Sequence, residues 1–80
     1  MIRLNFQIPS RAANVTPSDT TDVSGTVAFV ATSAGTVSVE TEGGDIANIG
    51  VSAGETIWIR VKRIRLTSTT ATGIVRFFGP

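Results

Sequence analysis

The chain has 80 residues, which suits one domain, and a formal net charge of +1. It contains no Cys and no His, so neither a disulfide nor a zinc site of the Cys/His kind can be built. No apolar run approaches the roughly 20 residues of a transmembrane helix, and no membrane association is expected. We expect a single domain over residues 1–80 that is stabilised by one small core, by association with other chains, or by both.

The N-terminal part of the chain predicts one strand and a long connection. Residues 2–8 alternate apolar and polar side chains, a pattern typical of a half-buried strand and not of a signal peptide. Pro9 ends this strand, because proline has no N–H to donate to a ladder. Residues 9–24 are rich in Ser, Thr, Asp, Asn and Pro, which predicts an extended connection or an arm that orders against a neighbour.

Residues 25–80 form the predicted β core. β-branched residues dominate this region, and no window of helical length carries a helical period. The first three strands are expected over residues 26–31, 36–41 and 46–51. Between the last two, the run Glu-Gly-Gly-Asp at residues 42–45 indicates a hairpin, because adjacent glycines favour a tight turn.

The C-terminal part predicts the remaining strands. The clearest alternation runs over residues 55–61 and predicts one continuous strand. The apolar period then slips by one residue, which predicts a β-bulge near Lys62 and Arg63. A Ser/Thr-rich turn over residues 67–72 leads to a last strand over 73–78. About six to eight short strands predict an all-β fold, a small antiparallel β-sandwich or barrel of jelly-roll-like form.

The residue content argues against an enzyme. Acid–base and nucleophilic catalysis most often use His, Cys or a base-activated Ser, and this chain lacks His, Cys and Tyr. Asp45 and Glu55 lie beside glycine-containing turns, where acidic residues are usually solvated turn residues and not a catalytic pair. The acids around residues 42–45 also lack the alternating oxygen ligands of a calcium loop. We therefore expect no catalysis, no metal and no cofactor.

The charges are unevenly distributed along the chain. All six acidic residues lie within the first 55 positions, and five of the seven basic residues follow them. This order indicates segments of opposite charge that meet either inside one subunit or between neighbouring subunits.

Seven residues are candidates for contact with a partner. A basic stripe with a neighbouring tryptophan can cover a sheet edge, meet an acidic protein surface, or bind a nucleic-acid strand by charge and stacking. The near-neutral net charge argues against nucleic acid. Phe77 and Phe78 must point to opposite faces of their strand, so one is expected in the core and the other exposed unless a neighbour covers it. The candidate interface residues are Trp58, Arg60, Lys62, Arg63, Arg65, Phe77 and Phe78.

One run near the C-terminus is distinctive, because residues 69–75 read Thr-Thr-Ala-Thr-Gly-Ile-Val. Together with residues 37–39, 43–45 and 51–64, this run resembles small virion proteins of tailed bacteriophages and gene transfer agents, and it is most similar to head-spike base proteins. The chain departs from the family pattern at two positions. Trp58 stands where proline is common, and Ser68 stands where a glycine is common.

The resemblance implies a β-sandwich subunit that assembles as a homo-oligomer, either a ring or a trimer, on the head surface of a virion. The partners that it implies are further copies of the chain, the major capsid protein, and a spike or fibre protein. The expected function is a virion structural protein, a head-spike base or another capsid-attached component that links the capsid to a spike or fibre. A capsid decoration (cement) protein and a single-stranded nucleic-acid-binding β module are the alternatives.

Overall fold

Seven β-strands and their connections make up residues 9–79, the part of the chain that this computed structural model describes. The strands are β1 (Arg11–Val15), β2 (Thr26–Ala31), β3 (Gly35–Thr41), β4 (Ile46–Val51), β5 (Thr56–Ile57), β6 (Val61–Arg65) and β7 (Ile74–Phe78). Every pair of neighbouring strands is antiparallel. The all-β antiparallel prediction is therefore confirmed, whereas the strand predicted over residues 2–8 lies outside the described residues.

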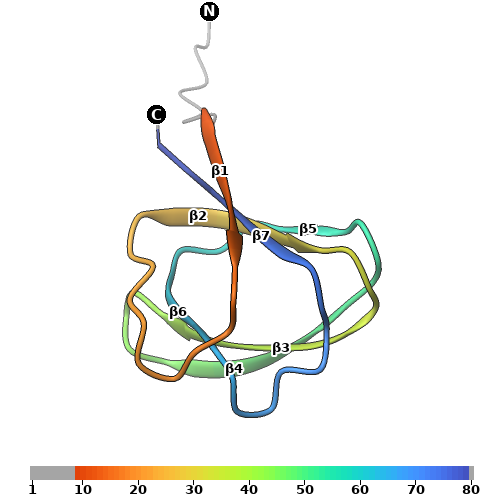
Figure 1. Cartoon of the computed structure of the whole chain (residues 1–80). Helices are drawn as coiled ribbons and strands as arrows, with labels where there is room; N and C mark the ends of the chain where they lie inside the picture. Colours follow the sequence, from red (N-terminus) through yellow and green to blue (C-terminus); the bar gives the residue numbers. More distant parts are fainter. Residues whose placement is uncertain (1–8, 80) are drawn as a thin grey trace, which may run out of the picture.

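One sheet bends into two layers (Figure 1). Its strand order is β1-β7-β2-β6-β3-β4, and β5 pairs with β2. Within the described residues, β2 and β6 pair only at Thr26 and Val61, so the sheet folds over at this point. As a result β1, β7, β2 and β5 form one layer, and β6, β3 and β4 form the other.

Apolar side chains from both layers fill the space between them. Phe29 of β2 is fully buried and is the largest side chain of this core. Val37 and Val39 on β3 occupy alternate positions, so both point inward, as the period of a strand requires. The further buried members of the cluster are Ala31, Val51, Val61, Ile64, Ala71 and Ile74.

Several local predictions are confirmed. The strands expected over residues 26–31, 36–41, 46–51 and 73–78 correspond to β2, β3, β4 and β7. The predicted hairpin closes where the Thr41 N–H donates to the Asp45 carbonyl at 2.8 Å. The predicted bulge also forms, because Glu40 lies opposite Arg63 and the next residue, Thr41, lies opposite Val61. Lys62 is therefore the extra residue of the bulge.

Two predictions are corrected. The connection predicted over residues 9–24 contains β1, which pairs with β7 along all five of its residues. Its sequence, Arg-Ala-Ala-Asn-Val, has little apolar period, so the ladder offered by β7 makes it a strand. The continuous strand over residues 55–61 is wrong, because β5 ends at Ile57 and β6 begins at Val61. Between these residues the chain crosses from one layer to the other, and a single ladder cannot serve both layers.

Candidate functional site

The basic stripe is neutralised in part by Glu40 on β3. The Glu40 carboxylate accepts a hydrogen bond from Arg63 Nη1 at 2.8 Å and lies 3.5 Å from Lys62 Nζ. The register of β3 and β6 explains the pair, because Glu40 and Arg63 are direct cross-strand neighbours. The hydrogen bond from Arg63 lowers the pKa of the Glu40 carboxyl below its ordinary value, and the charge of Lys62 adds to this effect.

A second acid, Asp19, holds the loop that follows β6. Its carboxylate accepts hydrogen bonds from the backbone N–H of Leu66 at 3.0 Å and of Thr67 at 3.1 Å, and from the Thr67 hydroxyl at 2.7 Å. Arg65 Nε lies 3.9 Å from the same carboxylate. The hydrogen bond from the Thr67 hydroxyl is the main reason that the pKa of Asp19 is lowered. Opposite charges therefore meet inside the subunit at Lys62, Arg63 and Arg65, one of the two arrangements expected from their order in the sequence.

The distinctive run at residues 69–75 binds β3 through its threonine hydroxyl groups. The Thr69 hydroxyl accepts a hydrogen bond from the Ser38 N–H at 2.9 Å, and the Thr70 hydroxyl accepts one from the Thr36 N–H at 2.9 Å. In return, the Thr70 N–H donates to the Thr36 carbonyl at 2.8 Å. Through these bonds, the run continues the hydrogen bonding of β3 past the end of its ladder with β6. The run therefore holds the two layers together at one end.

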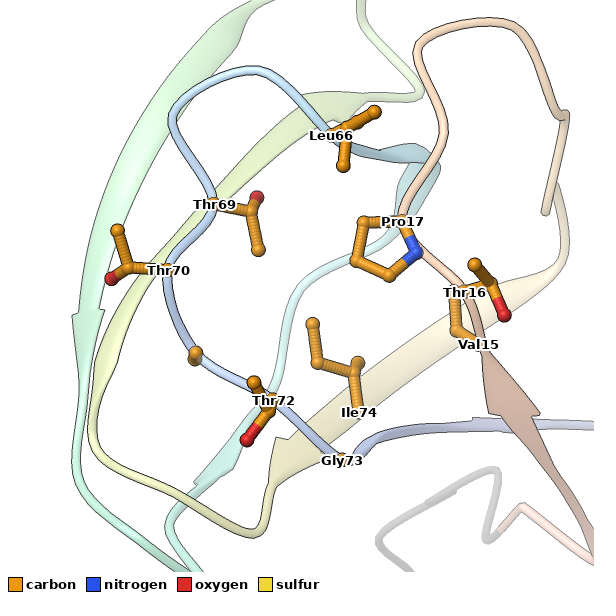
Figure 2. Close-up of a pocket in the computed structure, with 10 residues that line it drawn as sticks. Val15, Thr16, Pro17, Leu66, Thr69, Thr70, Thr72, Gly73 and Ile74 are labelled. Atoms are coloured by element: carbon orange, nitrogen blue, oxygen red, sulfur yellow. The ribbon is translucent and has the colours of Figure 1, made fainter.

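A pocket of about 330 Å³ opens between this run and the connection after β1 (Figure 2). Its lining residues are Val15, Thr16, Pro17, Leu66, Thr69, Thr70, Ala71, Thr72, Gly73 and Ile74. Pro17 and Ile74 point into the pocket, whereas the Thr70 and Thr72 hydroxyls point away from it (Figure 2). These hydroxyls are engaged elsewhere, with the Thr36 N–H and with Ser33 Oγ. None of the ten lining residues carries a charge, so the pocket suits an apolar group and not an ion.

The seven candidate interface residues differ in their exposure and in their contacts. Trp58 is 67% exposed, and Arg60 is exposed beside it. Neither phenylalanine behaves as expected, because Phe77 and Phe78 are both half-buried and neither belongs to the core cluster. The Phe78 ring instead lies between two guanidinium groups, with Arg76 Cζ at 3.9 Å and Arg11 Cζ at 5.0 Å from its centroid.

Sequence reasoning missed the contribution of Asp19 and of the threonines in the run. Asp19 and Thr67 are 48 positions apart, and Ser38 and Thr69 are 31 positions apart. No local pattern encodes such pairs. The repetition of threonine in residues 67–72 was the available signal, and it indicated only a turn.

Two properties of the described residues bear on the class of site. Within residues 9–79, no group of three or more Asp, Glu, His or Cys side chains comes together to hold a metal ion. The same part of the chain has no helix that is long and apolar enough to cross a membrane.

The chain is similar to a solved structure over most of its length. That structure is the capsid of a native gene transfer agent (GTA) particle, computed with C5 symmetry. The identity is 34%, the match covers 88% of this chain and 83% of that chain, and the TM-score is 0.78. No family model and no curated protein matches the chain.

Proposed function

We propose that this chain is the base of a spike or fibre on the head surface of a virion. The premise is that the chain belongs to the family of capsid-related proteins found in gene transfer agents and phages. A capsid-associated structural role follows from the family itself. The finer assignment adds that copies of the chain form an oligomer, bind the major capsid protein and carry a spike or fibre protein above it.

The single observation that carries this proposal is the match to the GTA capsid chain, which extends over nearly the whole of both chains. The surface of the protein supports it. Ile46, Trp58 and Leu66 are large apolar side chains with more than half of their surface exposed. A domain of 80 residues without disulfides gains stability when such groups are covered by a partner.

The charged groups also favour a structural role over an enzymatic one. Glu40 and Asp19 are kept ionised by hydrogen bonds that hold the fold together, so they are not poised to exchange protons near neutral pH. The pocket beside residues 69–75 contains no ionisable group. The ion pairs further weaken the nucleic-acid alternative, because Lys62, Arg63 and Arg65 already face acidic partners.

Particles assembled with and without the chain test the proposal. We expect particles without the chain to keep intact heads and to lose their spike or fibre, together with attachment to the host. Loss of head stability to heat or low salt, with attachment retained, would instead identify a decoration protein. Absence of the chain from purified particles would overturn both assignments.

A further inference from the structure

The two layers of the sheet have different outer faces. In the β6-β3-β4 layer, core-facing residues alternate with residues that point outward, and the outward-pointing residues are mostly polar or charged. This set consists of Thr36, Glu40, Asn48, Arg63 and Arg65, together with Ile46 and the fully buried Ser38. Such a face is typical of a sheet that is in contact with water.

The outer face of the other layer is apolar. Ile74 on β7 and Phe29 and Ala31 on β2 belong to the core, so the alternate residues of these strands point outward. The register places Phe77 between Ala12 of β1 and Ala28 of β2. In the next row, Val75 lies opposite Val30 of β2. The two polar members of these rows, Asn14 and Thr56, lie on the outermost strands.

Trp58 extends this face at the β5 side. Ile57 and Ile59 both pack against the core, so Trp58 between them points outward, with 67% of its surface exposed. β5 and β7 lie on either side of β2, and Trp58 directly follows β5 in the chain. We call Ala12, Val30, Trp58, Val75 and Phe77 the apolar outer face; Ala12 and Trp58 are exposed, and the other three are half-buried. Apolar side chains that stay accessible together on one face of a sheet are typical of a binding surface.

The chain itself supplies a segment that fits this face. Ile2, Leu4, Phe6 and Ile8 recur at every second position in residues 1–8 and give the segment one apolar stripe. The segment joins β1 next to the end of β7, because Arg11 lies opposite Phe78 and a Cβ added to Gly79 would lie 3.0 Å from Ser10 Oγ. Eight extended residues span at most about 29 Å, which exceeds the width of a four-stranded layer.

The outer face of a neighbouring copy is a better acceptor for residues 1–8 than the outer face of the same chain. Returning directly toward β1 would require a tight turn at Pro9 and Ser10. Two-residue hairpin turns need a positive φ at their first position, and proline fixes φ near −65°. We propose that residues 1–8 of one copy lie across the apolar outer face of a neighbouring copy and so link the subunits of the oligomer.

The inference rests on the proposed function in one respect, because a capsid-associated oligomer requires a contact between copies. Its test uses the purified chain alone, so failure would not bear on attachment to the capsid. Trp58 is the single tryptophan, and it therefore reports directly on whether the apolar outer face is covered.

The experiment compares two full-length double variants with the unchanged chain. One places charges on the apolar stripe (Leu4→Asp with Phe6→Asp), and the matched control places the same charge on the alternate positions (Asn5→Asp with Gln7→Glu). Acrylamide quenching of Trp58 and sedimentation are measured over a range of protein concentrations. We expect the unchanged chain and the control to form oligomers with a protected Trp58. The Leu4→Asp/Phe6→Asp variant should bind at least about 100-fold more weakly, with a mass near 8.4 kDa and an exposed Trp58.

A second pair of variants tests the acceptor surface. Phe77→Ser should weaken the oligomer and expose Trp58, whereas Ile46→Ser, on the outer face of the other layer, should not. Equal behaviour of the two N-terminal double variants would overturn the proposal. So would a monomeric unchanged chain at all concentrations, whether its Trp58 is exposed or is protected by its own N-terminal segment.

Discussion

Replacing Gly73 with alanine tests how the distinctive run holds the fold. Gly73 has a φ of +65°, a conformation that disfavours any residue with a Cβ. An added Cβ would overlap Thr32 Oγ1 and would lie 3.0 Å from Thr32 Cβ and 3.3 Å from its Cγ2. The Thr32 side chain cannot rotate away without losing a hydrogen bond, because its hydroxyl donates to the Thr72 carbonyl. The Thr32 backbone is also held in place, because its N–H donates to the Gly73 carbonyl.

The expected loss of stability combines two effects. Alanine in the left-handed conformation costs about 1–2 kcal/mol. The overlap with Thr32 adds about 1–3 kcal/mol, the usual range for overpacking. The total of about 2–5 kcal/mol is a large fraction of the about 4–12 kcal/mol expected for 80 residues. Gly54→Ala is the matched control, because Gly54 has a φ of +79° and an added Cβ would have no neighbour within 4 Å, so only the first effect applies.

Urea unfolding followed by circular dichroism, at one fixed protein concentration, measures these differences. Gly73→Ala should be less stable than Gly54→Ala by about 1–3 kcal/mol. Adding Thr32→Ala to Gly73→Ala should recover part of this difference, because it removes Oγ1 and Cγ2. If Gly73→Ala and Gly54→Ala lose the same stability, the close packing of Gly73 against Thr32 does not constrain the fold and the reasoning is wrong.

Three further predictions concern the core, the ion pairs and the loop after β6. Phe29→Ala should cost about 3–5 kcal/mol in urea unfolding, whereas the exposed Leu66→Ala should change stability by less than about 1 kcal/mol. The folded-state pKa of Glu40 is lowered from its ordinary value of 4.5, so its ion pair stabilises the fold above pH 4.5 and is lost as the pH falls through the lower folded-state value. The melting temperature should therefore fall more steeply below pH 4.5 in the unchanged chain than in Glu40→Gln. Asp19→Ala should speed hydrogen exchange at the Leu66 amide, whereas Asp45→Ala, in the distant hairpin, should leave it unchanged.

The strands that the sequence predicted correctly are those whose signal is local. In β3, alternate valines point into the core, and the glycines after it form the hairpin to β4. The bulge at Lys62 was predictable for the same reason, because an extra residue shifts the apolar period wherever it occurs. Each of these features depends on neighbouring positions in the chain.

The features that were missed depend on the packing of the two layers. Residues 55–61 alternate as one strand would, yet the chain changes layers after Ile57. Arg11–Val15 has no strand pattern and is ordered by β7, which follows about 60 residues later. The candidate interface stays a prediction. Of its aromatic members, Trp58 is exposed and Phe77 is half-buried, while the cations of β6 form intramolecular pairs whose partners only the register of β3 reveals.

The distinctive run at residues 69–75 and Trp58 therefore have different roles, one in the fold and the other at the surface. Thr69 and Thr70 hydrogen-bond to β3, and Gly73 packs against Thr32, so this run specifies how the two layers are joined. Residues 58–60, in contrast, lie outside the ladder, and position 58 points away from the core. Proline, which is common there in the family that the sequence resembles, is compatible with such a position because no ladder hydrogen bond is required. A change from proline to Trp58 should leave the architecture intact, and it adds a large apolar group to the outer surface. We therefore expect differences between relatives in what they bind at this position and not in the run.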